Sequence, residues 1–362
     1  MKKAILGTTA LVAVGALAAS PALAAEKIKL NVGGYMQSTY FYQDSDEPAG
    51  TPSRTSDRVT QEGEIHFKGS TTLDNGIQFG VEVQLEAYTN ADQLDETFIF
   101  IEGSFGRVLI GSEDSAAYLM HYASPSPVPM YSADSPNIWP TGQFNTTRPN
   151  LFGFRDVDKI TYFTPRFAGF QLGGSYVPDG TSETGSLGNG QYSAPNPKAG
   201  LDRSWSAAAN YVNKFGAVDV AFSAGYQEGK VFGAAEDMSE YSFGTSIGVA
   251  GFTIGGGYKQ VKDIAGISDN DSKVWSAGLK YGMGPWAVGV QYAKTTFDQL
   301  QTVGTGTLDD QDTWIIGGQY TLGPGITAFG GVQMDDNNLT ASSSTRMAGE
   351  TNTFFVGTAL SF

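Results

Sequence analysis

The chain has 362 residues, a formal net charge of −15 and no cysteine. The missing cysteines exclude a disulfide framework and a thiolate metal site, and the acidity argues against a nucleic-acid partner, whose phosphates require a basic surface. After residue 25 no run of 18 apolar residues occurs, which excludes membrane-spanning helices but not membrane-spanning strands.

Residues 1–25 have the pattern of a secretory signal peptide. Lys2 and Lys3 precede an apolar run over residues 4–19, and "ALA" at residues 22–24 is a small-residue cleavage signal. A transmembrane anchor is the alternative, but the run is short and ends at a cleavage pattern. We therefore expect residues 26–362 to form the mature protein, exported through the periplasm.

Alternating apolar and polar residues predict β-strands along the mature chain. In residues 77–87 the apolar side chains fall in one phase, and Gln78, Glu82, Gln84 and Glu86 fall in the other. Residues 218–227 and 274–281 repeat this split. Successive side chains of a strand point to opposite faces, so each segment has one apolar and one polar face. Helical spacing fits none of them.

Short turns alternate strictly with longer polar segments. The short turns are predicted at residues 74–76, 103–106, 166–169, 214–216, 249–251, 282–285 and 323–325. The longer segments are predicted at residues 43–57, 89–95, 112–156, 178–202, 227–239, 262–272, 298–312 and 335–350. Fifteen connections imply sixteen strands, and the even number places both termini on the short-turn side.

This loop asymmetry predicts an all-β fold, a sixteen-stranded antiparallel transmembrane β-barrel with short periplasmic turns and long extracellular loops. A soluble β-sandwich is the alternative, but strict asymmetry behind a signal peptide fits it poorly. Tyrosine and tryptophan near the strand ends suit interfacial girdles. The polar inward phase and the strand number predict a water-filled channel, because such a barrel is too wide for side chains to fill.

The mature chain resembles the general diffusion porins of Gram-negative outer membranes. The resemblance rests on "GEIHFKGSTTLDNGIQFGVEVQLEA" (residues 63–87), "GSFGRVLIG" (103–111), "FRDVDKITYFTPRFAGFQLGGSYV" (154–177) and "TNTFFVGTALSF" (351–362), which ends in an aromatic residue. It implies a homotrimer in contact with outer-membrane lipid and lipopolysaccharide, whose barrels pass small hydrophilic solutes. It also implies a third loop that folds into the lumen of each barrel.

That loop, residues 112–156, is called here the constriction loop. Five prolines between Pro125 and Pro140 keep it out of regular helix and sheet. The resemblance implies that its charged residues face the barrel wall across the constriction. They are Glu113, Asp114, Asp134, Arg148 and Arg155, the last at the family's basic position.

The opposite wall departs from the family pattern. The resemblance places Glu64 and Glu96 where wall arginines are usual, although a shift of one residue would turn Glu96 outward. The other inward wall residues are Glu62, His66, Lys68, Glu82 and Glu86. A ring of carboxylates favours cations, which predicts a pore with a modest cation preference. Clustered carboxylates also suit Ca²⁺, but no ligand spacing identifies a site, and no other cofactor is expected.

Two alternatives remain open. A substrate-specific channel, such as a sugar porin, would use loop aromatics, here Tyr118, Tyr122, Tyr131 and Trp139. A barrel hydrolase would use Glu64, His66 and Ser70, which share one strand face. Residues at i and i+2 lie roughly 7 Å apart, so hydrogen bonds among these three are not expected and the chain is not expected to be an enzyme.

Overall fold

The computed structural model describes residues 26–45, 56–88, 94–129, 131–135, 145–150, 156–179, 201–231, 233–303, 306–339 and 349–362. The predicted signal peptide, Arg155 and Trp139 lie outside the described residues. Within the described part of the chain, no helix is both long and apolar enough to cross a membrane.

The described residues form sixteen β-strands and two short helices. The strands are β1 (Lys29–Ser45), β2 (Asp57–Thr72), β3 (Gln78–Glu86), β4 (Leu94–Gly103), β5 (Gly106–Ser112), β6 (Asp158–Phe163), β7 (Phe170–Asp179), β8 (Leu201–Phe215), β9 (Val218–Val231), β10 (Asp237–Val249), β11 (Phe252–Lys262), β12 (Ser272–Met283), β13 (Trp286–Val303), β14 (Gly306–Gly323), β15 (Ile326–Leu339) and β16 (Gly349–Ser361). The helices are α2 (Ala116–Leu119) and the 3₁₀ turn η2 (Ile264–Gly266).

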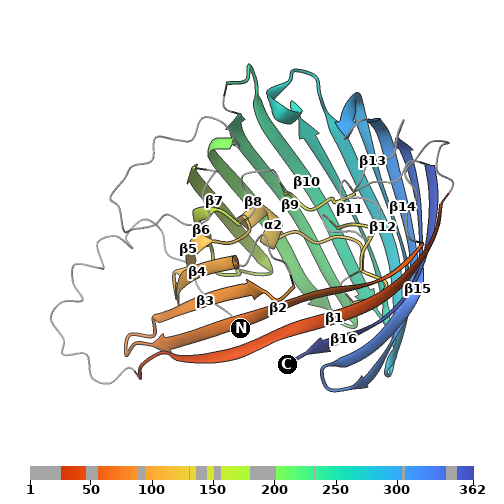
Figure 1. The fold of residues 1–362 in the computed structure, drawn as a ribbon. Helices are drawn as coiled ribbons and strands as arrows, with labels where there is room; N and C mark the ends of the chain where they lie inside the picture. Colours follow the sequence, from red (N-terminus) through yellow and green to blue (C-terminus); the bar gives the residue numbers. More distant parts are fainter. Residues whose placement is uncertain are drawn as a thin grey trace.

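Each strand pairs antiparallel with its neighbours in sequence, and β1 pairs with β16 to close the barrel (Figure 1). The closing register runs from Tyr35 opposite Ser361 to Ser45 opposite Thr351. Gly34 and Phe362 add two backbone hydrogen bonds, of 3.0 and 3.1 Å, beyond the end of this ladder. Closure leaves no sheet edge with unpaired backbone groups, as a lipid environment demands. The predicted sixteen-stranded barrel is confirmed.

One end of the barrel carries tight turns and the other carries the longer connections. Gly76 and Gly251 have φ of 79° and 84°, a conformation that glycine adopts without strain. The predicted long segment at residues 298–312 is wrong, because β13 and β14 extend through it and pair as far as Val303 and Gly306. In this hairpin the polar residues beyond the apolar band still pair their backbone N–H and C=O groups across the two strands. A prediction that ends each strand where the sequence becomes polar therefore makes these two strands too short.

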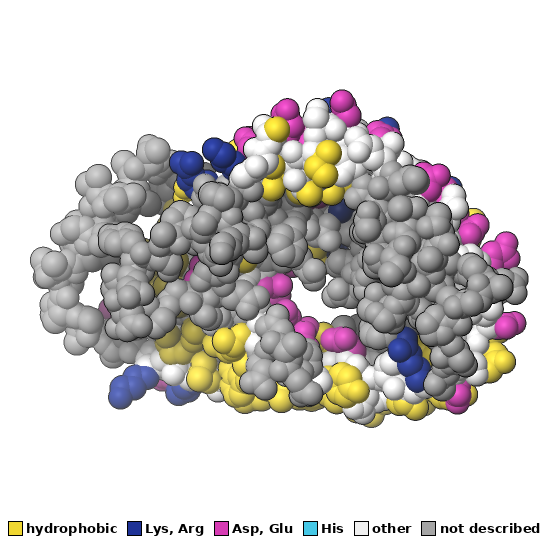
Figure 2. Space-filling view, turned by 45° about the horizontal axis from the view of Figure 1, so that its top comes forward, with side chains coloured by type: hydrophobic (Ala, Val, Ile, Leu, Met, Phe, Trp, Pro, Cys, Tyr) yellow, Lys and Arg dark blue, Asp and Glu magenta, His cyan; other side chains and the backbone are white. Residues whose placement is uncertain are grey.

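The outward phase of the strands is apolar. Leu30, Val32, Leu172 and Val356 expose 56–63% of their surface, and the predicted outward residue Trp275 is also exposed. Figure 2 shows part of this apolar band along one side of the molecule. A lysine or arginine at the middle of such a band would cost about 2–4 kcal/mol in a bilayer.

Aromatic pairs border the apolar band near both ends of the strands. Near the short turns, the ring centroids of Trp286 and Tyr320 lie 4.4 Å apart on β13 and β14. Near the longer connections, Trp275 on β12 lies 4.8 Å from Tyr292 on β13. Rings with an apolar body and a polar edge suit the membrane–water boundary, so these two rows are the expected girdles.

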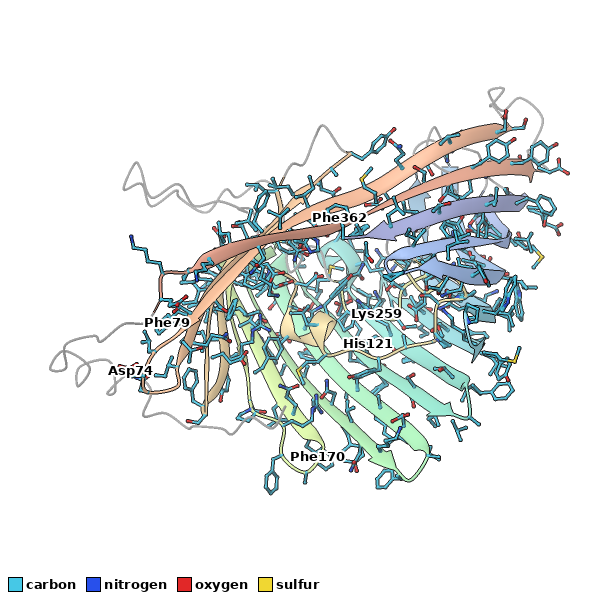
Figure 3. All side chains as sticks on the ribbon, turned by 90° about the horizontal axis from the view of Figure 1, so that it is seen from below. Asp74, Phe79, His121, Phe170, Lys259 and Phe362 are labelled. Atoms are coloured by element: carbon cyan, nitrogen blue, oxygen red, sulfur yellow. The ribbon has the colours of Figure 1, made fainter. Side chains whose placement is uncertain are left out.

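The inward phase is polar, and part of it is covered by the constriction loop, which crosses the lumen (Figures 1 and 3). In Figure 3 His121 of the loop and Lys259 of β11 lie within the ring of strands, whereas Phe170 lies at its periphery. Gln227, Gln291, Gln311 and Gln333 are fully buried. The apolar core under the loop is small and consists of Phe41, Val128, Tyr131, Ala133, Ala293, Ile315, Phe329 and Phe355.

Candidate functional site

The constriction loop begins with the single helical turn α2. Ser115 caps it, with its side-chain oxygen accepting a hydrogen bond from the Tyr118 backbone N–H at 3.2 Å. Such a cap satisfies one of the free N–H groups at a helix start. Ala116 and Ala117 are buried, so their small side chains let the turn pack closely against β7, β8 and β9.

Hydrogen bonds to wall side chains fix the path of the loop. Ser175 and Ser223 accept from the backbone N–H groups of Ala116 and Tyr122 at 2.8 and 2.9 Å. Gln291 accepts from the Ala133 N–H at 2.7 Å and donates to Ser124 at 2.8 Å. The described parts of the loop are therefore held by hydrogen bonds to the wall from β7 to β14, and Tyr131 packs on Phe355 of β16 and Phe41 of β1. The free lumen lies beside β2–β4 and the adjoining part of β1.

Asp134 holds two parts of the loop together and ties them to the wall. It accepts from the Thr147 backbone N–H at 2.7 Å, from the Thr147 hydroxyl at 2.6 Å and from Ser276 on β12 at 2.5 Å. The predicted constriction carboxylate Asp134 lines the lumen, but its hydrogen bonds serve the loop itself.

Buried His121 supports the same junction. Its Nε2 lies 3.2 Å from the Thr147 oxygen. The Thr147 hydroxyl donates to Asp134, so it accepts from His121, which defines the Nε2–H tautomer. Burial, with the charges of Arg148 and Lys259, lowers the pKa of His121 to about 3, so this histidine is neutral at physiological pH.

The free lumen beside the loop contains a cavity of about 370 Å³ among the described residues, called here the eyelet cavity. Tyr35, Glu62, Glu64, Glu86 and Asp95 line it from the strands, and Tyr118, Ser124, Tyr131, Asp134 and Arg148 line it from the loop. Figure 2 shows an opening through the molecule with Asp and Glu side chains at its edge. The strands thus contribute the predicted acidic wall, and the loop contributes a cation.

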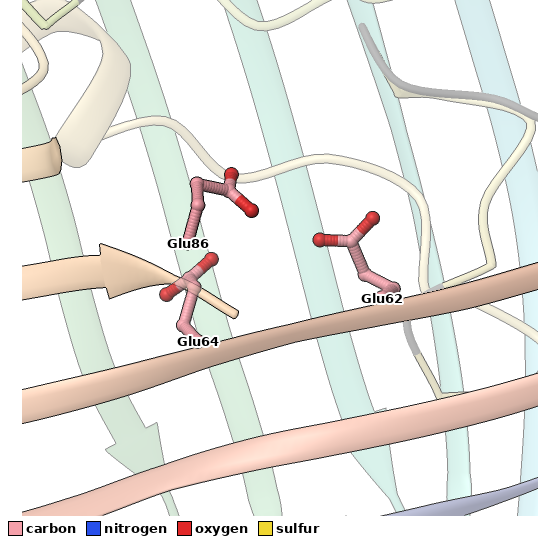
Figure 4. A group of neighbouring side chains, drawn as sticks. All are labelled: Glu62, Glu64 and Glu86. Carbon is pink, nitrogen blue, oxygen red and sulfur yellow. The ribbon is translucent and has the colours of Figure 1, made fainter. Parts of the chain in front are cut away.

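Three glutamates form the centre of this wall. Glu62 and Glu64 extend from β2 and Glu86 from β3, toward the loop (Figure 4). One carboxylate oxygen from each lies within 4.8 Å of the others. Like charges this close repel one another, so together they produce a strong negative potential in the eyelet cavity.

Glu64 also pairs with two neighbouring side chains. The Tyr35 hydroxyl donates to one of its oxygens, and His66 Nε2 lies 2.7 Å from the other. The prediction that Glu64 and His66 do not touch is wrong, because two long side chains bridge the distance between their backbone positions. Ser70 is not part of this group; it accepts from Gln78 at 3.0 Å.

Glu96 faces inward as predicted, and a β-bulge brings Asp95 to the same side. Val83 pairs with Thr97 and Leu85 with Leu94, so Asp95 and Glu96 together oppose one residue of β3. Oxygens of Glu64, Asp95 and Glu96 lie within 4.8 Å, as do oxygens of Glu96, Asp114 and Asp156. Strict alternation would turn Asp95 outward, so sequence reasoning missed it, and it missed Asp156 and Tyr35 as well.

The carboxylates therefore form a continuous acidic track from the eyelet cavity to the start of the loop. Carboxylate oxygens are the ligands that Ca²⁺ prefers, and these groups are the places where the track could hold such an ion. Calcium binding stays a prediction, for which equilibrium dialysis with labelled Ca²⁺ is the measurement.

The remaining predicted charges lie at the edges of the track. Glu82 is buried and pairs with Lys68 at 2.6 Å. Arg148 lines the eyelet cavity with its guanidinium over the Tyr118 ring, 4.7 Å from the centroid. Glu113 accepts from the Asp114 N–H at 2.9 Å and lines a second cavity, outside the lining of the eyelet cavity.

A closed barrel with an apolar outer band, aromatic girdles and a polar lumen narrowed by its own loop defines a transmembrane pore protein. The comparison with family models agrees. The model described as Gram-negative porin matches residues 7–340, and the chain belongs to this family. It is an outer-membrane pore protein, and both the family and the fold point to a channel.

Solved structures share the fold at low sequence identity. An anion-selective porin from Comamonas acidovorans aligns with a TM-score of 0.64 and 19% identity over 93% of this chain and 100% of its own. OmpT of Vibrio cholerae in its trimer form aligns with a TM-score of 0.61 and 12% identity over 93% of this chain and 100% of its own. A mutant of the Rh. blastica porin aligns with a TM-score of 0.56 and 14% identity over 92% of this chain and 100% of its own. Among curated protein sequences no significant match is found.

Proposed function

We propose that the protein is a passive diffusion pore for small hydrophilic solutes and ions, with a modest preference for cations. The lining of the eyelet cavity supports this selectivity. It contains Glu62, Glu64, Glu86, Asp95 and Asp134 against Arg148 as its one cation among the described residues. Carboxylate rings favour cations in pores, and partial exclusion of water from a narrow passage strengthens their effect.

The anion selectivity in the name of the Comamonas acidovorans porin belongs to that protein. At 19% identity its likeness to this chain shows the fold alone. Ion selectivity depends on the side chains at the eyelet. Proteins that share this barrel fold can carry different side chains there, because lumen residues do not face the lipid.

Reversal potentials across a planar bilayer in a salt gradient test the preference. We expect a reversal potential whose sign shows that cations permeate more readily than anions. Replacing Glu62, Glu64 and Glu86 together by glutamine should move the permeability ratio toward one. Glu228→Gln is the matched control, since that carboxylate accepts a hydrogen bond from Tyr226 in the outward phase of β9. A clear chloride preference in the unmodified protein would refute the proposal.

We further propose that three copies assemble, in contact with outer-membrane lipid and lipopolysaccharide. The resemblance implies a trimer, and the Vibrio cholerae structure of similar fold is described in a trimer form. Ile28, just before β1, and Leu30 and Val32 of β1 present an exposed apolar face, where the resemblance places the contact between copies.

A substrate-specific channel is the less well supported candidate. Tyr131 packs against Phe355 with ring centroids 4.4 Å apart, and Tyr118 lies beneath Arg148, so both rings are engaged in packing. Liposome swelling with sugars of increasing size separates the two: rates that fall smoothly with size support general diffusion, and one favoured sugar supports specificity.

A further inference from the structure

A second cavity lies against the inner wall on the short-turn side of the constriction loop. It is called here the vestibule pocket and is defined by Glu102, Arg107, Leu109, Glu113, Phe163 and Asn210. Its volume is about 650 Å³, and Met120 and Tyr122 of the loop border it. Cavities of this size commonly hold small molecules.

The strand register gives the pocket an apolar surface with a charged edge. On successive inward rungs, Phe98 pairs with Gly111, Phe100 with Leu109 and Glu102 with Arg107. Phe98, Phe100 and Leu109 form one buried cluster, and Phe163 packs against it. A solute in the pocket therefore meets hydrocarbon beside a guanidinium.

Two polar groups of the pocket have unused hydrogen-bonding capacity. Arg107 Nε is buried without a hydrogen-bond partner among the described residues, since Glu102 lies 3.9 Å away, beyond hydrogen-bonding range. Asn210 is 6% exposed. Its amide donates to the Met120 carbonyl at 3.2 Å, and its buried Oδ1 has no partner within the described part of the chain. Both of these atoms are covered by neighbouring groups, but the Arg107 side chain as a whole is 36% exposed, so its other N–H groups meet a solute that supplies an acceptor.

Charge distinguishes this pocket from the eyelet cavity. Lys68, Arg107 and Arg166 balance Glu82, Glu102 and Glu113 in its lining, whereas the eyelet lining is strongly acidic. Balanced charges beside an apolar surface suit a solute that carries both charges and a hydrocarbon side chain.

We propose that the vestibule pocket is a binding site for small zwitterionic solutes with an apolar side chain, the class of the apolar α-amino acids. The solute carboxylate binds the Arg107 guanidinium, and its ammonium binds the acidic edge that Glu102 and Glu113 contribute to the lining. The side chain packs on Leu109 and Phe163. The inference rests on the proposed pore function, since a solute reaches the pocket through the channel.

Current recordings through the reconstituted protein test the assignment, with phenylalanine as the probe. Phenylalanine should interrupt the current in a saturable, concentration-dependent manner. Glycine, 3-phenylpropanoate and phenylalanine amide each lack the side chain or one of the charges, and each should bind at least about tenfold more weakly. Equal blockade by phenylalanine and glycine would overturn the proposal.

Two variants locate the site. Arg107→Gln should weaken phenylalanine blockade about tenfold by removing the charge-assisted contact. Leu109→Ala should reduce the advantage of phenylalanine over glycine. Lys273→Gln is the matched control, because that lysine pairs with Asp298 at 3.3 Å in an exposed position, and it should leave blockade unchanged. Unchanged blockade in Arg107→Gln and Leu109→Ala overturns the assignment.

Failure of the pore itself gives a different result. A folded protein without any conductance contradicts the proposed function. Calorimetric titration of the detergent-solubilised protein with phenylalanine then tests the pocket alone. A binding heat in the unmodified protein that is absent in Arg107→Gln supports the site, and the absence of a binding heat in the unmodified protein overturns it.

Discussion

Glu113 shows how burial adjusts a carboxylate beside the lumen. The residue is 8% exposed, and burial is the largest cause that raises its pKa, to about 7. The neighbouring Glu82 and Asp156 raise the pKa further, whereas the Asp114 N–H and Lys159 act against the shift. A carboxyl with a raised pKa is neutral below that pH and charged above it.

We expect the cation preference to increase between pH 6 and pH 8 as Glu113 loses its proton. The folded state also holds this proton more tightly than the unfolded state. The contribution of Glu113 to the free energy of unfolding therefore falls as the pH rises from the ordinary carboxyl pKa to about 7. Reversal potentials at both pH values provide the measurement. Glu113→Gln should reduce the change in reversal potential between the two pH values, and Glu228→Gln should leave that change as it is in the unmodified protein. An undiminished change in Glu113→Gln would refute this role.

At the scale of elements, the constriction loop depends on glycines in the wall behind it. A Cβ at Gly244 of β10 would overlap the Tyr122 carbonyl oxygen, which is backbone and cannot rotate away. A Cβ at Gly248, on the same strand, would meet the Asp219 side chain at an ordinary 3.6 Å. The loop therefore lies directly on β10 at Gly244 and leaves space at Gly248.

This difference predicts distinct effects for one added methyl group. Gly244→Ala should displace the loop, change the single-channel conductance and lower the free energy of unfolding by about 1–3 kcal/mol, as overpacking commonly does. Gly248→Ala should leave both quantities close to their original values. Conductance steps and urea unfolding measure the two effects, and a Gly244→Ala protein that matches Gly248→Ala would contradict the close contact.

The sequence predicted these elements where a periodic signal existed. Alternation identified the strands and the inward phase of Glu82 and Glu86, because lipid outside and water inside impose a period of two. The family resemblance placed Glu64 and Glu96 on the inner wall. Alternation missed Asp95, since a bulge breaks that period, and it misplaced the loop at residues 298–312, since paired strands continue above the apolar band. The Ser124–Ser276 and Asn145–Thr313 hydrogen bonds, each of 3.0 Å, join residues far apart in sequence, and no local pattern announces such contacts.

At the scale of the molecule, closure and loop insertion together determine the pore. Pairing of β1 with β16 fixes a wide ring, and the described parts of the loop, held against β7–β14 and packed on β16, leave the passage beside β2–β4 and the adjoining part of β1. The carboxylates of β2, β3 and β4 then border that passage. Strand number was predictable from the alternation of short and long connections, and the family resemblance implied an inserted loop, but which wall the loop covers follows from its three-dimensional contacts.

Single-channel recording of the purified protein in a planar bilayer tests this account most directly. We predict discrete, long-lived conductance steps that scale with salt concentration, with closures in thirds if three barrels assemble, and a reversal potential of the sign set by cations. Properly folded protein that inserts without conductance steps would contradict the assignment of the lumen as an open pore.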